Sequence, residues 1–261
     1  MASVYFILSA LTAIGNSKVF TDSFSLRGDK MKKITYSGIH PSLKDIWWNA
    51  FMVRTCQKWY KHDIPFCPTL RIEVPKDLII WTEAITVYNK EIKTNKDFKD
   101  ERYICFYLHD QFFDRLHGIW FDYNKAIEII KHFGGIISPD FSTNIDFPQG
   151  LKYFNTYRMR AFGYWVSTFG INVINNVRWS HDTKAYCFNG IPKNSVVCLG
   201  TSASGLTVKK NREEYEYFLK LMVTKLKPKI ILVYGSSNYS FFRELEEQGI
   251  IIKTYYHNWR S

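Results

Sequence analysis

Short apolar runs alternate with helical stretches over most of this chain, and this alternation constrains its fold more than any other feature. The apolar runs lie at residues 103–108, 136–138, 173–177, 196–199, 230–234 and 250–255. Helical periodicity lies between them at residues 124–133, 148–169, 213–226 and 241–248. Parallel strands need long crossover connections, which are usually helices, so this order predicts an α/β fold. We expect a largely parallel sheet of about five to seven strands with flanking helices, either open and doubly wound or an incomplete barrel.

Three further local features accompany this pattern. Residues 43–60 are expected to form an aromatic-rich amphipathic helix that packs over one side or end of the sheet. Residues 79–92 fit either a strand or a helix. Gly134 and Gly135 follow a helical stretch and indicate a helix C-cap before the next strand.

The chain is long and apolar enough for a sizeable core: it has 261 residues, of which 46% are hydrophobic. We expect a single α/β domain at residues 41–261, preceded by an extension of uncertain order at residues 1–40. The apolar stretch at residues 4–14 is too short to span a bilayer, and Met31 offers a second start. No other segment approaches 18 apolar residues. The sequence therefore predicts no integral membrane association and a cytoplasmic location.

Charge is distributed unevenly along the chain, whose formal net charge is +11. Residues 61–150 carry 11 basic and 14 acidic groups, a net of −3, whereas residues 151–261 carry 16 basic and 7 acidic groups, a net of +9. A basic C-terminal half indicates a polyanionic partner, nucleic acid first and an anionic membrane second. Ordinary lysine-rich composition is the competing interpretation.

The five cysteines show no C-x-x-C pair, so neither a complete disulfide framework nor a zinc site is predicted. They are expected to be reduced, buried thiols. The sequence also lacks a nucleophile elbow, an HExxH motif and a dinucleotide fingerprint, which leaves acyl transfer, zinc proteolysis and hydride transfer unsupported.

A string of motifs carries a family resemblance. It comprises GIISPDFS at residues 135–142, NTYRMRAFGYW at 155–165, NVRW at 176–179, FNGIPK at 188–193 and VCLGT at 197–201. From about residue 40 to its end, the chain resembles the DUF4417 family of phage, prophage and mobile-element proteins, a domain of unknown function. The resemblance implies a mobile-element origin and no particular activity.

The predicted helix at residues 148–169 places one arginine among apolar side chains. At 100° per residue, Arg158 falls in the middle of the apolar face with Asn155 beside it, whereas Arg160 falls on the opposite face and is expected in solvent. A buried guanidinium needs an anionic partner. A bridge from Arg158 to Asp140 would satisfy it. Alternatively, Arg158 and Arg178 form a bidentate anion clamp at the switch point of the sheet.

Polar residues interrupt the apolar elements where strands end, and the carboxyl edge of a parallel sheet is where ligands bind. We expect one pocket there that binds a phosphate or another ligand. Its expected lining is Ser142, Asn155, Arg158, Asn176, Arg178, Trp179, Thr201, Ser204 and Gly235.

Acidic residues near the same strand ends suggest a catalytic alternative. Asp140 and Asp110, joined by Asp114, would hold Mg²⁺ for phosphodiester cleavage if they converged, with His109 or His117 as the general base. Helix or turn capping is the competing role for Asp110 and Asp114. Apart from Mg²⁺ in that case, the sequence identifies no cofactor.

Two small, hydroxyl-rich loops follow strands at residues 200–205 and 235–238. Such loops present backbone N–H groups to phosphates, although simple turn chemistry explains them as well. The first loop lacks the Lys and Ser/Thr pair of a P-loop.

Together these features predict a phage or mobile-element protein that binds or processes nucleic acid through a basic, arginine-containing pocket. The alternative is a non-catalytic module that binds a nucleotide or a host protein. Whether the chain is an enzyme stays open at this point.

Overall fold

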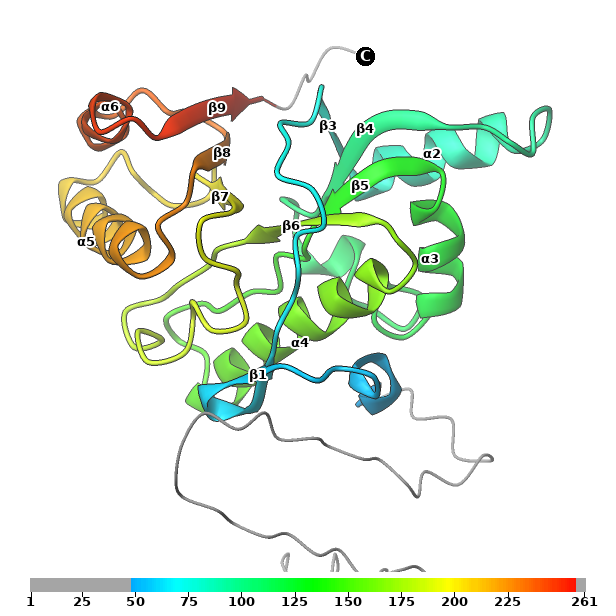
Figure 1. Ribbon diagram of the computed structural model, residues 1–261, viewed down its shortest axis with the longest axis horizontal. Helices are drawn as coiled ribbons and strands as arrows, with labels where there is room; N and C mark the ends of the chain where they lie inside the picture. The colour runs from blue at the N-terminus through cyan, green and yellow to red at the C-terminus, as the bar shows by residue number, and fades with distance from the viewer. Residues whose placement is uncertain (1–47, 257–261) are drawn as a thin grey trace, which may run out of the picture.

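The computed structural model describes residues 48–256, in which a seven-stranded parallel sheet curls into a half-barrel (Figure 1). The order of the strands in space is their order in the chain, and every neighbouring pair is parallel. The strands are β3 (Leu78–Ile80), β4 (Asp100–Cys105), β5 (Phe133–Ile137), β6 (Asn172–Asn176), β7 (Val196–Gly200), β8 (Ile230–Tyr234) and β9 (Ile251–Tyr255). The α/β class and the parallel sheet expected from the sequence are confirmed.

Five α-helices flank this sheet in the described chain. They are α2 (Trp81–Glu91), α3 (Tyr123–Ile130), α4 (Gln149–Ser167), α5 (Lys209–Leu226) and α6 (Ser240–Glu247). Each provides the crossover between two consecutive strands. The β6–β7 connection, at residues 177–195, contains turns instead of a helix. Among the described residues, no helix has both the length and the apolarity needed to cross a membrane.

The winding of the sheet decides between the two architectures expected. Right-handed crossovers that always step in the same direction place all the helices on one face. Ile104, Ile136 and Val173 accordingly pack in one cluster with side chains of α2, α3 and α4. Sheet side chains of the opposite parity, such as Cys105 and Ile137, form a cluster that contains no helix residue. A doubly wound sheet carries helices on both faces, so the protein is the incomplete barrel and has no switch point.

A segment that we call the strap, residues 66–77, crosses from the helix α4 side to the start of β3 (Figure 1). Near its beginning, Asn175 Nδ2 donates to the carbonyl of Cys67 over 3.0 Å. Further along, Arg71 and the side chain of Asn172 exchange two hydrogen bonds of 3.0 Å. The Tyr255 hydroxyl then donates to the carbonyl of Pro75 over 2.6 Å. The strap therefore links β9, at one edge of the seven-stranded sheet, to the chain just before β3, at the other edge.

The aromatic N-terminal helix expected at residues 43–60 is not present in the part that the structure describes. Beyond residue 47 there is only a 3-10 turn, η1 (Ala50–Val53), and Trp59 begins the short strand β1 (Trp59–Tyr60), which pairs with β2 (Ile64–Pro65). Asn49 adopts a left-handed conformation, and its side chain donates to the Trp120 carbonyl. Phe51 packs against Trp165 of α4. These tertiary contacts outweigh the helical pattern. Residues 43–47 lie outside the described chain, as does the expected domain boundary at residue 40.

The two interpretations of residues 79–92 each describe part of the structure, because β3 ends at Ile80 and α2 begins at Trp81. The C-cap expected at Gly134 and Gly135 is wrong, since both glycines lie inside β5. A Cβ on Gly135 would lie 2.4 Å from Cε2 of Tyr103, so glycine is needed to admit that ring.

The expectation that Arg160 lies in solvent is also wrong, because this residue is fully buried. Helix α4 lies between the sheet and the η1 and β2 segments, so it is covered on both faces. The Arg160 guanidinium donates to the carbonyls of Asn176, Cys187 and Asn189 over 3.0–3.3 Å. It thereby fixes the β6–β7 connection to α4, and burial lowers the pKa of Arg160 to about 10.

Candidate functional site

A cavity of about 1640 Å³ opens at the carboxyl edge of the half-barrel. Every strand of the sheet contributes lining residues at its C-terminal end or just beyond it: Ile80, Tyr107, Asp140, Asn176, Gly200, Tyr234 and Tyr256. Barrel enzymes place their sites at this edge, because the loops that follow the strands converge there. The volume exceeds the range of about 300–1,000 Å³ typical of small-molecule pockets, so the cavity has room for a ligand of nucleotide size or larger.

Asp140 lies at the centre of the polar lining. Its Oδ1 accepts from Asn176 Nδ2 over 2.7 Å, and its Oδ2 pairs with Arg178 Nη1 over 2.6 Å. Burial raises the pKa of Asp140, against the lowering influence of the Arg178 charge and of the Asn176 amide. A buried carboxyl with a raised pKa can hold or release a proton closer to neutrality than an exposed one.

Tyr107 extends this network across the cavity. Its hydroxyl donates to Asn176 Oδ1 over 2.9 Å, and its ring stacks on Tyr234 with centroids 4.9 Å apart. A Cβ on Gly200 would lie 3.0 Å from the Tyr107 ring, which explains glycine at the end of β7. Burial raises the pKa of Tyr107 well above its usual value, so the hydroxyl stays protonated and acts as a donor.

A second network lies behind the cavity and does not open into it. Arg158 forms a bidentate pair with Asp114 at 2.7 and 2.8 Å and donates to Asn155 Oδ1 over 2.7 Å. The guanidinium also lies 3.9 Å from the Phe141 ring centroid. Asn155 in turn donates to the carbonyl of Ser142. Arg158 is only 6% exposed, so this network holds the loop after β5 against α4.

The expected clamp of Arg158 and Arg178 does not form, and neither does the bridge from Arg158 to Asp140. Each arginine has its own carboxylate: Asp114 for Arg158 and Asp140 for Arg178. The helical wheel gave the inward direction of Arg158 correctly, but it carried no information on which loop would supply the partner. Arg158 and Asn155 therefore support the site from behind, whereas Arg178 lines it.

The two small loops pack on one another. Thr201 is buried and its hydroxyl donates to the carbonyl of Ser236 over 2.9 Å, and Ser204 Oγ donates to the carbonyl of Gly200 over 2.9 Å. Gly235 has φ +112°, and a Cβ there would lie 2.5 Å from Thr201 Oγ1. These hydroxyls thus stabilise the turns, while Ser204 and Gly235 still line the cavity and Thr201 lies behind them.

The acidic residues proposed as metal ligands do not converge. Asp110 accepts from the backbone N–H and the hydroxyl of Ser142 over 3.0 and 2.8 Å, and Asp114 is taken up by Arg158. Within residues 48–256, no three His, Cys, Asp or Glu side chains are grouped so that they could hold a metal. His109 lines the cavity beside Asp110, whereas His117 does not.

The cavity lining is not basic, contrary to the expectation from the sequence. It contains the carboxylates of Asp110, Asp140 and Glu214 and the single guanidinium of Arg178, which already pairs with Asp140. The other basic residues of the described C-terminal half lie outside this lining: some are exposed on α5, such as Lys209 and Lys210, and others are buried, such as Arg160.

Within residues 48–256, two buried hydroxyls of the lining have no hydrogen-bond partner. They belong to Thr143, which is 2% exposed, and Tyr215, which is 6% exposed. A buried polar group without a partner costs about 1–3 kcal/mol, so these positions favour a bound molecule that supplies the partner. Neither residue was expected from the sequence. Nor were Tyr107 and Tyr234, although both occur at the ends of apolar runs, which is the signal that identified Asp140.

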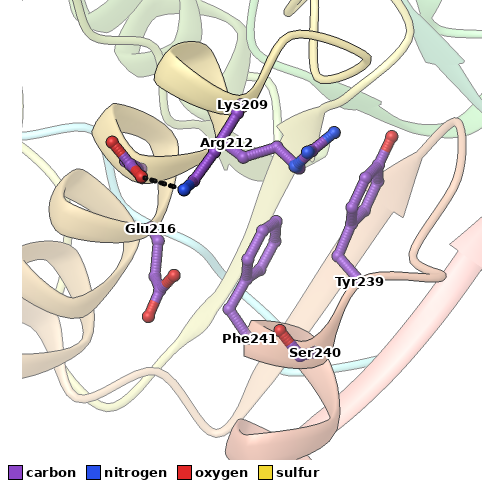
Figure 2. A pocket seen from close by; sticks show the side chains of 7 residues that line it. Lys209, Arg212, Glu216, Tyr239, Ser240 and Phe241 are labelled. Atoms are coloured by element: carbon purple, nitrogen blue, oxygen red, sulfur yellow. Dashed lines mark ion pairs between the residues drawn. The ribbon is translucent and has the colours of Figure 1, made fainter.

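Figure 2 shows a second, smaller pocket of about 230 Å³ between the first turns of α5 and α6. Lys209 pairs there with Glu213 at 3.8 Å, and the guanidinium of Arg212 donates to the carbonyls of Leu206 and Thr207. The rings of Tyr239 and Phe241 stack beside them with centroids 5.2 Å apart. Both cations of this pocket are therefore already engaged.

Comparison with known proteins gives a family and two phage relatives. The family model described as a domain of unknown function (DUF4417) matches residues 60–256. The chain is 32% identical over 145 residues to the Gene 1 protein of Mycobacterium phage L5, which covers 54% of this chain and 61% of the relative. It is 29% identical over 139 residues to the Gene 1 protein of Mycobacterium phage D29, and this match covers 51% of this chain and 48% of the relative. The chain thus spans about half to three fifths of the length of these relatives. No solved structure matches.

Proposed function

Since the chain belongs to the DUF4417 family, whose description names no activity, we propose from the site itself that the protein binds single-stranded nucleic acid. In this proposal one unpaired nucleotide enters the cavity at the carboxyl edge. The observation that carries it is a cavity of about 1640 Å³ with an aromatic lining and two buried hydroxyls that have no partner in the part of the chain that the structure describes.

The chemistry of the lining fits a nucleobase better than a phosphate. Phe112, whose ring is half-exposed, and Trp179 line the cavity, and stacking of a base on an aromatic ring contributes about 1–3 kcal/mol per base. The carboxylate of Asp140 and the amide of Asn176 are hydrogen-bonding groups that suit the polar edge of a base. A cavity with more carboxylates than cations would repel the phosphate, which therefore stays at the rim. A duplex does not present an unstacked base, so the proposal is restricted to single strands.

A nucleotide-binding module without affinity for strands is the second candidate. The acidic lining favours it, because such a lining suits the base of a free nucleotide and supplies no track for a phosphate backbone. Processing of the bound strand is a further step, for which Asp140 is the group able to exchange a proton.

Binding to a fluorescent single-stranded oligonucleotide and to nucleoside monophosphates tests the proposal on the full chain. Phe112→Ala removes a half-exposed ring of the lining and should weaken oligonucleotide binding about tenfold, which corresponds to about 1.4 kcal/mol. Leu116→Ala is the matched control, since Leu116 is 69% exposed in the same loop but lies outside the cavity.

Equal loss of affinity in both variants, or none in either, contradicts the proposed site. Binding of monophosphates without any binding of the oligonucleotide selects the nucleotide module instead. Strand cleavage in Mg²⁺ that is lost in Asp140→Asn would make the protein an enzyme.

A further inference from the structure

Five lysines lie beside the C-terminal half of α5, and three of them are at the amino edge of β7 and β8, at the opposite end of the sheet from the cavity. They are Lys184, Lys193, Lys225, Lys227 and Lys229, which we call the lysine corner. The Lys225 ammonium donates to the carbonyl of Lys184 over 3.5 Å, and two backbone hydrogen bonds join the other two chain segments. Asn194 N–H donates to the carbonyl of Leu226 over 2.8 Å, and Lys229 N–H donates to the carbonyl of Ser195 over 2.9 Å.

No carboxylate of the described residues neutralises the charges of the lysine corner. All five lysines are exposed, and within residues 48–256 none of them forms an ion pair. The acidic residues of α5, Glu213, Glu214 and Glu216, all lie in its first half, whereas this corner adjoins its last turn. The C-terminal carbonyls of a helix account for one or two nearby cations, but not for five from three segments.

Lys227 is the most informative member. It caps α5 in a left-handed conformation with φ 48° and ψ 54°, where glycine is favoured and a side chain is strained. The chain therefore has a lysine at a position where the backbone conformation favours glycine.

An aromatic side chain completes the surface. Tyr217 is 48% exposed, and the ammonium of Lys184 donates to its hydroxyl and lies 4.9 Å from its ring centroid. Lysines beside an exposed ring match the backbone and bases of a nucleic-acid strand, since the cations meet phosphates and the ring offers stacking.

We propose that the lysine corner is a second nucleic-acid contact, which binds the phosphate backbone of the strand whose unpaired nucleotide occupies the cavity. The inference rests on the proposed function. Helix α5 connects the two places: Asn211 in its first turn lines the cavity, and its 18 residues span about 27 Å. The ligand is therefore a strand of several nucleotides and not a mononucleotide.

The test measures oligonucleotide affinity as a function of salt for a triple variant, Lys193→Gln with Lys227→Gly and Lys229→Gln. Each phosphate contact contributes about 0.7 to the slope of log affinity against log salt for single strands, so the slope should fall by about 2. Affinity at about 0.1 M salt should fall at least about tenfold. Lys227→Gly relieves the left-handed backbone, so the variant keeps its fold. The control is Lys96→Gln with Lys125→Gln, two exposed lysines far from α5 in the sequence, which should leave the slope unchanged.

The outcomes separate this inference from the proposed function. Binding of nucleoside monophosphates should be the same in the triple variant and the wild type, whereas Phe112→Ala should weaken it. A wild-type slope in the triple variant overturns the lysine corner and leaves the cavity standing. A reduced slope in the triple variant together with unaffected binding in Phe112→Ala overturns the cavity and leaves the corner standing. If the wild type binds phosphatidylserine vesicles but no oligonucleotide, the corner is a membrane contact and the inference is wrong.

Discussion

Asp140 combines burial, an arginine partner and a cavity position, and each has a local cause. Asp140 lies just after the end of β5. Ser138, between them, accepts a hydrogen bond at its hydroxyl from the backbone N–H of Asn176 over 2.9 Å. That bond places Asn176 beside the carboxylate, and Arg178, two residues further, supplies the cation. Positions after neighbouring parallel strands are thereby brought within hydrogen-bonding distance.

The raised pKa of Asp140 predicts a specific pH dependence of stability. In the folded state the carboxyl binds its proton more tightly than in the unfolded state, where its pKa is about 3.9. As pH rises from about 4 through the folded-state pKa, ionisation therefore costs the wild type stability that Asp140→Asn does not lose.

Urea unfolding of both proteins between about pH 4 and pH 7 measures this difference. Relative to the wild type, Asp140→Asn should gain in free energy of unfolding as pH rises. The loss of the Arg178 pair adds an offset, but only the trend with pH tests the pKa. A relative loss in stability of Asp140→Asn with rising pH would show that Arg178 lowers the pKa below its ordinary value.

Individual residues also show where sequence reasoning ends. The inward direction of Arg158 follows from helical geometry alone, because its neighbours on the wheel are apolar. The burial of Arg160 does not, because it depends on carbonyls of a turn-containing loop and on segments that cover the second face of α4. Hydrophobic periodicity identifies one buried face of a helix and does not show that the opposite face is buried as well.

At the level of elements, two glycines differ in how closely neighbouring side chains pack against them. Gly135 lies under the Tyr103 ring, so Gly135→Ala should destabilise the protein by about 1–3 kcal/mol through overpacking. Gly150, in the first turn of α4, has no atom within 4 Å of a built Cβ. Gly150→Ala should leave stability unchanged or raise it by up to about 1 kcal/mol through helix propensity. Denaturant unfolding of the two variants measures both effects, and equal stabilities would contradict the packing described here.

The existence and type of most elements could be predicted from the sequence. The runs at residues 230–234 and 196–199 became β8 and β7, since strands buried on both faces are continuously apolar. The region around Ile80 was ambiguous because a strand passes directly into a helix there. The glycines of β5 were wrongly assigned to a helix C-cap. Glycine is needed there because the Tyr103 ring of β4 packs against the strand, and this contact joins segments about 30 residues apart.

For the whole molecule, strand order was the property that local patterns could not supply. Doubly and singly wound sheets share the same alternation of strands and helices, and only the direction of each crossover separates them. The direction also decides the site: a singly wound half-barrel gathers the ends of all seven strands around one cavity, whereas a switch point gathers the ends of two. The expectation of one polar pocket at the carboxyl edge was therefore useful, although its basic character was wrong.

Photocrosslinking shows whether a bound strand places its unpaired nucleotide in the cavity. A single-stranded oligonucleotide with one photoreactive thio-substituted base is irradiated in complex with the full chain, and mass spectrometry identifies the crosslinked peptides. Crosslinks are expected within residues 107–112, 140–147 and 176–181, the segments that contain much of the cavity lining. Additional crosslinks at Tyr217 would agree with the lysine corner. A complex that crosslinks with no peptide of the cavity lining would contradict the account.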